Sequence, residues 1–297
     1  MSGLPLCATN RLPEARPSYA MALEQPPKYI YKEHDIRPED VRVPTEHDTF
    51  VFEGRPVRAF IQPQTTFDGA RVVGGELLLR TIIGNDVPIQ RIEDAEQNGS
   101  IHEVTLGMLR CAAIHSALLA QQGMLSRMSV NVSANELNAE FVDEVREILR
   151  ETKSDPSLIT LEITERQPIK EQHYGTLHAL RDLGVHLAVD DFGTEHATME
   201  VLMRLRAEGL DIDEVKVDKG LLDAGAAEDT VRQLFAHEFQ TVVVEGIEDL
   251  KRAIAMFDRR VILQGYAVGK AMPFRSFSER VAAENQPSFG LTEVNNQ

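Results

Sequence analysis

LITLEITERQPIKEQHYGTLHALRDLGVHLAVDD, residues 158–191, is the stretch from which the fold can be predicted. Its two ends, 158–164 and 185–191, are nearly continuous apolar runs, as in strands that are buried on both faces. The segment between them, 172–184, has the apolar spacing of a helix and ends at a glycine. Together they predict a strand, a crossover helix and a second, parallel strand.

Polar residues follow successive strand-like runs along most of the chain. Their intervals are 55, 31, 28, 26, 29 and 19 residues, and they are Glu76, Asn131, Glu162, Asp190, Lys216, Glu245 and Gln264. A βα unit takes about 30 residues, so most intervals match one unit and the first matches two. In a (β/α)8 barrel the carboxyl ends of the strands meet at one mouth, where these side chains are expected to converge. Converging carboxylates need a compensating charge, which divalent metal ions commonly supply.

The alternation of strand and helix patterns extends on both sides of the quoted stretch. Further strands are expected at 129–133, 213–218, 241–246 and 261–266, and further helices at 102–122, 136–152, 199–209, 228–239 and 248–258. Before them, VRAFIQP (57–63) and RVVGGELLL (71–79) flank Asp68-Gly69, which is a hairpin signal. The predicted fold class is therefore α/β, a (β/α)8 TIM-like barrel with one antiparallel strand.

The pattern also predicts the domain organisation. Residues 1–56 combine clustered prolines with weak periodicity, which indicates a largely irregular N-terminal extension with a short helix near Pro38. We expect the barrel at 57–275 and a C-terminal tail at 276–297. A barrel of this kind typically uses about 250 residues, so a chain of 297 can hold one.

Composition limits the partners and the compartment. The net charge of −16 argues against a DNA or RNA polymer as partner, because such binding needs a basic surface. Cys7 and Cys111 form no metal-binding spacing and no disulfide framework. The start of the chain lacks the apolar run of a signal peptide, and no stretch reaches the roughly 18 apolar residues of a membrane span. We therefore expect a cytoplasmic protein without membrane insertion.

Seven short motifs, taken together, resemble a known family. They are ELLLR (76–80), NVS (131–133), EITE (162–165), VDDFGT (189–194), VKVD (215–218), VVEGIED (243–249) and LQGY (263–266). Each is weak alone, but their order and βα spacing resemble those of EAL-domain proteins, bacterial phosphodiesterases that open the second messenger cyclic di-GMP. The resemblance implies an enzyme, a cyclic-guanylate-specific phosphodiesterase that hydrolyses cyclic di-GMP to linear pGpG by the attack of a water activated by two metal ions.

The resemblance also implies roles for individual residues. Two Mg²⁺ or Mn²⁺ ions would bind at the barrel mouth. The first would be held by Glu76, Asn131, Glu162 and Asp190, and the second by Asp190, Asp191 and Glu245. Among the catalytic positions, Lys216 would hydrogen-bond the metal-bound water and Gln264 would help to hold it. Glu245 and Glu165 are the other two catalytic positions that the resemblance implies. Arg80 would meet a phosphate, Gln62 would approach a guanine, and Leu78 would also contact the substrate.

The chain departs from the family pattern at two places. The signature Glu-Ala-Leu reads Glu-Leu-Leu, and because the side chain of Leu77 should point away from that of Glu76, we expect the change to affect packing more than metal binding. The loop DDFGTEHAT (190–198) has Glu195, His196 and Ala197 where the family has Gly, Tyr and Ser. In the family this loop is held by the second glutamate of EITE, here Glu165, and is associated with metal coordination and dimer coupling.

The departures leave a second function open. The chain could bind cyclic di-GMP as a receptor, or act as a protein-interaction module, with weak or absent turnover. A different metal-dependent barrel, such as an enolase-like lyase, would need a base and a carboxylate clamp that the sequence does not offer. A homodimer, and a protein partner bound through the N-terminal extension, also stay open.

Overall fold

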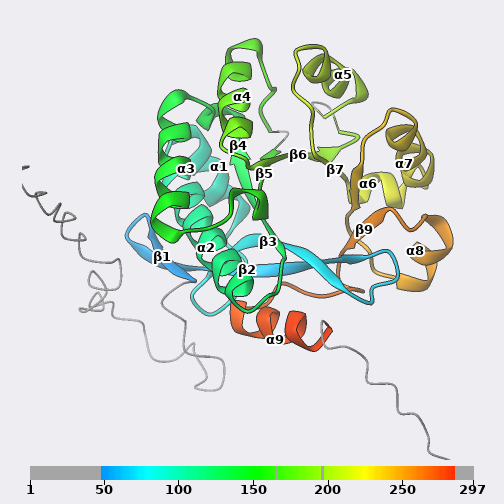
Figure 1. Ribbon diagram of the computed structural model, residues 1–297, viewed down its shortest axis with the longest axis horizontal. Helices are drawn as coiled ribbons and strands as arrows, with labels where there is room; N and C mark the ends of the chain where they lie inside the picture. The colour runs from blue at the N-terminus through cyan, green and yellow to red at the C-terminus, as the bar shows by residue number, and fades with distance from the viewer. Residues whose placement is uncertain (1–47, 165, 195–196, 285–297) are drawn as a thin grey trace, which may run out of the picture. The chain divides into compact units, whose positions relative to one another are not determined.

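The computed structural model describes residues 48–164, 166–194 and 197–284. Strands β2 to β9 form a closed barrel, because each strand pairs with the next and β2 also pairs with β9. Every pair from β3–β4 to β8–β9 is parallel, whereas β2 is antiparallel to both of its barrel neighbours. The helices lie outside the ring of strands, and α9 lies along β2 (Figure 1). This is the predicted (β/α)8 barrel with one antiparallel strand.

The elements have the following bounds. The strands are β1 (Thr49–Phe52), β2 (Arg55–Thr66), β3 (Val72–Thr81), β4 (Arg127–Ser133), β5 (Ile159–Thr164), β6 (His186–Phe192), β7 (Glu214–Val217), β8 (Thr241–Val244) and β9 (Val261–Gln264). The α-helices are α1 (Ile89–Asn98), α2 (Ile101–Gln121), α3 (Ala139–Thr152), α4 (Tyr174–Asp182), α5 (Met199–Ala207), α6 (Lys219–Asp223), α7 (Ala227–Ala236), α8 (Leu250–Met256) and α9 (Phe274–Glu284). Single 3₁₀ turns occupy Ala134–Glu136, Pro156–Leu158 and Glu171–His173.

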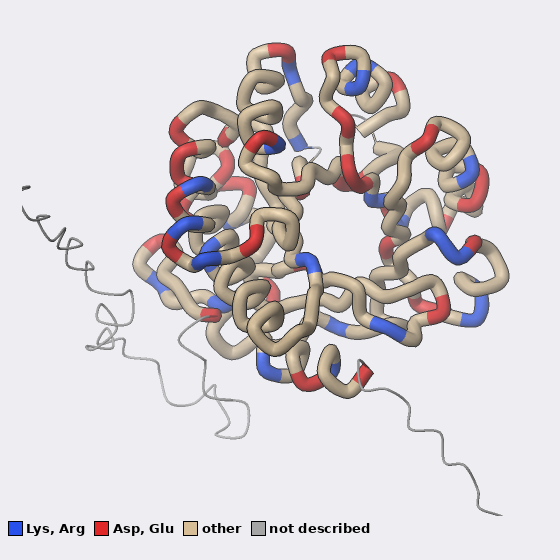
Figure 2. Tube along the Cα trace, viewed as in Figure 1, with Lys and Arg blue, Asp and Glu red and all other residues tan. Residues whose placement is uncertain are grey.

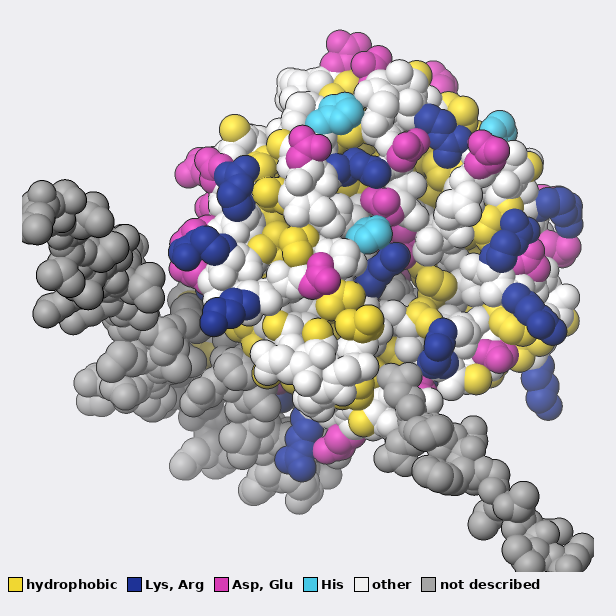
Figure 3. Space-filling view, in the orientation of Figure 1, with side chains coloured by type: hydrophobic (Ala, Val, Ile, Leu, Met, Phe, Trp, Pro, Cys, Tyr) yellow, Lys and Arg dark blue, Asp and Glu magenta, His cyan; other side chains and the backbone are white. Residues whose placement is uncertain are grey.

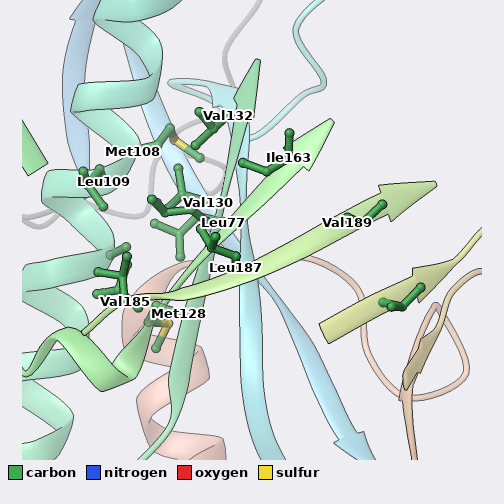
Figure 4. Packing of buried hydrophobic residues seen from close by; sticks show 14 of the residues in the cluster. Leu77, Met108, Leu109, Met128, Val130, Val132, Ile163, Val185, Leu187 and Val189 are labelled. Carbon is green, nitrogen blue, oxygen red and sulfur yellow. The ribbon is translucent and has the colours of Figure 1, made fainter. Parts of the chain in front are cut away.

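The main core lies between the strands and the surrounding helices. Leu77 and Val130 on β3 and β4 pack toward Met108 and Leu109 on α2 (Figure 4). Because side chains alternate along a strand, Leu77 faces this layer while its neighbour Glu76 faces the barrel interior. The substitution in Glu-Leu-Leu therefore falls in the packing layer, as expected from the alternation.

The long helix α2 corrects one expectation. By length and composition alone it could cross a membrane, so the sequence does contain one segment of that apolarity. Its apolar residues are used in the barrel, however, since 56% of its most hydrophobic window is buried. The helix has the burial expected of a core helix, which explains its composition without a lipid environment.

Packed structure extends beyond both predicted boundaries of the barrel. β1 lies inside the predicted N-terminal extension, where it pairs with β2 and buries Phe50 and Phe52. The predicted tail, 276–297, begins inside α9, which buries Phe277 and Val281 against the barrel. The short helix expected near Pro38 lies outside the described residues.

The amino end of the barrel contains a buried carboxyl group that no predicted role uses. Glu214 is the first residue of β7 and lies on the same face as Lys216, in the barrel interior. It is 4% exposed, and within the described part of the chain its Oε1 has no hydrogen-bond partner. Burial raises the pKa of this carboxyl to about 7, so the folded protein holds its proton through the mildly acidic range.

We expect Glu214→Gln to remove a pH-dependent loss of stability. The ordinary pKa is 4.5, so folding favours the protonated form, and the free energy of unfolding falls as pH rises from 4.5 to about 7. The raised pKa corresponds to a decrease of about 3 kcal/mol in the free energy of unfolding across this pH range. Urea unfolding should therefore give the variant a higher free energy of unfolding than the wild type at pH 8, but not at pH 5. An equal difference at both pH values would contradict this account.

Candidate active site

The carboxyl ends of the strands open into a cleft of about 430 Å³. Residues from β3 to β7, from α1 and α2, and from the segments that follow β5 and β8 line it, including Glu76, Asn131, Asp190, Asp191, Lys216 and Glu245. Figure 2 shows acidic residues around the inner ring of strands as well as on the outer helices. On the face drawn in Figure 3, Lys and Arg side chains are interspersed with Asp and Glu and form no continuous basic surface.

Lys216 lies among four carboxylates at the bottom of the cleft. Its Nζ is 2.8 Å from Glu162 Oε2 and 3.2 Å from Glu76 Oε2. It is also 2.9 Å from both Asp190 Oδ1 and Glu245 Oε1. The side chain is 1% exposed, so its charge is balanced by these residues and not by water. The strand spacing predicted that these side chains would meet, and the structure brings all five together.

The ammonium group cannot serve its four partners equally. An ammonium has three donors, and the directed hydrogen bonds within the described residues go to Glu76 and Glu162. Asp190 and Glu245 are both within ion-pair distance of Nζ. The geometry at Asp190 is not that of a hydrogen bond, and its Oδ1 has no hydrogen-bond partner in the described chain. Two amides complete the surroundings of Glu76: Gln264 Nε2 donates to its Oε2 at 2.6 Å, and Asn131 Nδ2 donates to its Oε1 at 2.7 Å.

One positive charge against four carboxylates leaves the cluster short of cations. Burial raises the pKa of Glu162 well above its usual value, and it raises the pKa of Glu245 to about 8, although Lys216 opposes both shifts. Burial would also raise the pKa of Glu76, but Lys216, Gln264 and Asn131 outweigh it, so that pKa is lowered. Burial alone would lower the pKa of Lys216, yet the carboxylates raise it well above the ordinary value. The lysine stays charged, and the acidic groups compete for protons or for another cation.

The backbone near the carboxyl end of β6 places two adjacent aspartates in the same cleft. The pairing of β6 with β7 is irregular between Val189 and Phe192, and Asp191 has a positive φ of 49°. In a regular strand the side chains of Asp190 and Asp191 would point to opposite faces, and this turn brings both to the mouth. Aspartate tolerates the left-handed region better than most residues. Gly193 has a positive φ of 109° as well, and a Cβ there would lie 2.2 Å from Leu221, so the turn that starts at Asp191 needs a glycine two residues later.

The donor set fits a divalent metal ion. Asp190, Asp191 and Glu245 each offer a carboxylate oxygen, and these oxygens lie within 4.8 Å of one another. Glu162 Oε1 is buried and has no hydrogen-bond partner among the described residues, as expected for an oxygen that awaits a cation. Hard divalent ions bind carboxylate and amide oxygens, the groups that line this mouth. The residues present therefore suit the use of a divalent metal.

The remaining predicted residues differ in position. Leu78 and Arg80 line the cleft. Gln62 pairs with Glu76 across β2 and β3, but its Nε2 points to Gly269 O, 3.4 Å away, and it is not among the cleft residues. Glu165, Glu195 and His196 lie outside the described residues, so the predicted contact between that glutamate and the altered loop has no structural description.

The cleft also contains charged residues that the motifs did not indicate. Arg166 follows EITE, and its Nη1 is 3.5 Å from Glu96 Oε1 on α1. Asp86 pairs with Arg80, with Oδ1 3.1 Å from Nε. Glu136 also lines the cleft, and it accepts hydrogen bonds from the Thr105 hydroxyl and from the backbone N–H of Ser133. A charged residue two positions after the end of β5 was a signal for Arg166, but its pairing with Glu96 and that of Glu136 with Thr105 join segments far apart in the sequence.

Comparison with known proteins gives the family. The model of the EAL domain matches residues 52–271. A protein named "Probable cyclic di-GMP phosphodiesterase PdeN", from Escherichia coli (strain K12), is 30% identical over 230 residues, which are 73% of this chain and 43% of that protein. The chain spans less than half the length of the first curated relatives that it matches.

Solved structures agree with this assignment. A cyclic di-GMP complex of the PaMucR phosphodiesterase has 27% identity and a TM-score of 0.66, over 74% of this chain and 94% of that chain. A manganese and cyclic di-GMP complex of Klebsiella pneumoniae BlrP1 has 22% identity and a TM-score of 0.60, over 75% of this chain and 58% of that one, and this likeness concerns the fold alone. Because the family model covers well over half of the sequence, and the barrel has the expected topology, the chain belongs to the EAL domain family.

Proposed function

We propose that this chain is a metal-dependent phosphodiesterase that hydrolyses cyclic di-GMP to linear pGpG. The observation that carries the proposal is the buried cluster of Lys216 with Glu76, Glu162, Asp190 and Glu245 at the mouth of an EAL barrel. A cluster this acidic is costly to bury unless cations occupy it. The names of PdeN and PaMucR, both phosphodiesterases, support the substrate class.

The proposed ligands divide into two groups that share Asp190. Glu76, Asn131, Glu162 and Asp190 would hold one Mg²⁺ or Mn²⁺ ion, and Asp190, Asp191 and Glu245 would hold the other. Two such ions, when bound, supply a nucleophilic hydroxide at neutral pH and stabilise the charge on the leaving oxygen. Because burial raises the pKa of Glu245, protons would compete with a metal ion for this carboxylate.

The chain's own residues orient the reaction. Lys216 holds Glu76 and Glu162 in place through its hydrogen bonds, and its charge counters the negative charge that develops on the phosphoryl oxygens. Gln264 fixes Glu76 from the other side and is itself held by Gln64 at 2.9 Å. Arg80 lies on the cleft wall, where it would meet a phosphate. Water would attack phosphorus, the bond to the ribose 3′ oxygen would break, and that oxygen would leave with a proton.

The altered loop supports one alternative, a cyclic di-GMP receptor or interaction module with little turnover. Glu195, His196 and Ala197 replace residues that the family associates with metal coordination and dimer coupling. Of the three, Ala197 is described: it is buried, and its carbonyl accepts a hydrogen bond from the N–H of Gly193 at 2.9 Å. This bond holds the backbone that directly follows the turn at Asp190 and Asp191, and the enzyme remains the preferred function.

The test is a turnover assay with a chelated control. Purified protein is incubated with cyclic di-GMP and Mn²⁺ or Mg²⁺, with excess EDTA in a parallel sample, and the products are separated by chromatography. We expect pGpG only in the metal samples, and the faster metal would identify the preferred ion. Tight binding without product in either metal would favour the receptor, and product in EDTA would contradict the metal-dependent mechanism.

A further inference from the structure

The second phosphate of the proposed substrate needs a partner in the cleft. This inference rests on the proposed function, because cyclic di-GMP carries two phosphodiesters and a single one is cut at a time. Among the described residues that line the cleft, the Lys and Arg side chains are Arg80, Arg166 and Lys216. The contacts that these three side chains already make determine which of them can accept a further anion.

Two of these cations are already engaged. Lys216 is 1% exposed and is committed to four carboxylates. Arg80 is 19% exposed, and it donates from Nη1 to Leu79 O at 2.8 Å and pairs through Nε with Asp86 at 3.1 Å. Its remaining donors can serve one phosphate. Neither residue is therefore suited to bind a second phosphate as well.

Arg166 is more accessible and less firmly held. Its side chain is 39% exposed, and within the described chain its ion pair is with Glu96 at 3.5 Å, a distance and geometry short of a hydrogen bond. Such partly exposed pairs contribute little stability, so exchanging Glu96 for another anion costs little. A guanidinium group binds phosphate through parallel N–H donors, which makes phosphate the better partner.

The strand order places Arg166 on a different part of the cleft wall from Arg80. Arg80 belongs to β3 and Arg166 follows β5, with β4 between them. Neighbouring strands lie about 4.8 Å apart, so two positions separate the backbones by about 10 Å. Two long side chains from these positions can approach the two phosphates of one cyclic dinucleotide.

We propose that Arg166 is a substrate-binding residue that takes the phosphodiester of cyclic di-GMP that is not being cut, in exchange for its contact with Glu96. Because this phosphate does not react, the contact is the same in the ground state and in the transition state. Its loss should raise KM and leave kcat unchanged.

Kinetics of Arg166→Gln test the proposal with two substrates. For cyclic di-GMP, KM should rise about tenfold to a hundredfold, the range expected for a lost charge-assisted hydrogen bond, and kcat should stay within about twofold. For bis(4-nitrophenyl) phosphate, which has one phosphodiester, neither constant should change. Arg166→Lys should restore part of the affinity, because it restores the charge without the paired donors.

Arg181→Gln is the matched control. Arg181 forms a comparable ion pair with Asp213 at 3.4 Å, has a 31% exposed side chain, and is not among the cleft residues. Its substitution should leave both substrates unaffected. An unchanged KM for cyclic di-GMP in Arg166→Gln, or equal losses on both substrates, would overturn the assignment while the wild type remains active. Failure of the proposed function would appear differently, as absent turnover in the wild type and in Arg181→Gln alike.

Discussion

Lys216→Met should lower the free energy of unfolding by about 3–5 kcal/mol in the presence of a chelator, the usual cost of removing one partner from a buried ion pair. Methionine has a similar length and no charge, so the packing volume is kept while Glu76, Glu162, Asp190 and Glu245 lose their common cation. The carboxylates can escape repulsion only by taking up protons. The loss should therefore be larger at pH 8 than at pH 6.

Divalent metal ions should reverse much of this loss. An ion that binds the folded state alone stabilises it by about 2.7 kcal/mol at a concentration of 100 times Kd. Urea unfolding of Lys216→Met with EDTA and with Mn²⁺ measures the effect. Lys219→Met is the control: this lysine pairs with Glu248 on the surface with 46% of its side chain exposed, and its loss should leave the free energy of unfolding nearly unchanged. Equal stability of Lys216→Met and wild type in EDTA would mean that charge balance does not hold the cluster.

The barrel was predictable because its strands carry a strong local signal. The runs 158–164 and 185–191 are apolar on both faces, and β5 and β6 lie within a residue of them. Elements that are short or that bury few residues escaped prediction. α1 buries Ala95 alone among its ten residues, and α6 has five residues, too few to show a helical period. β1 is four residues long and is stabilised by pairing with β2, which no local pattern can reveal.

The site was predictable as a set of residue types and not as a network. Regular spacing indicated that Glu76, Glu162, Asp190 and Lys216 would share one mouth, because parallel strands end at the same edge. It gave no information on how Lys216 divides its donors or on the positive φ of Asp191, since both depend on contacts between strands. The pair Arg166 and Glu96 joins segments that are 70 residues apart, so it required the folded chain.

Glu76→Gln and Asp190→Asn should each lower the rate of pGpG formation by about 10³-fold or more, because each removes the charge of a proposed metal ligand at the point where negative charge develops. Glutamine at position 76 keeps the size of the side chain, so the loss reports charge and not a cavity. Lys216 Nζ donates to Glu76 Oε2 at 3.2 Å in the wild type. If the amide NH2 of glutamine takes the place of that oxygen, two donors face each other. Asp190→Asn affects both proposed ions, since Asp190 is shared between the two sets of ligands.

Glu214→Gln provides a matched control for both variants. Glu214 is also a buried carboxyl in the barrel interior, but it lies at the amino end of β7 and does not line the cleft. Its substitution should keep turnover within about threefold, since it touches no reacting group. Chromatographic product assays, with circular dichroism and Mn²⁺ titration of each variant, separate lost chemistry from lost folding. Wild-type rates in Glu76→Gln or Asp190→Asn would refute the assigned ligands. If a folded variant instead loses both Mn²⁺ binding and turnover, the substituted carboxylate is a metal ligand, and the metal binds at the barrel mouth.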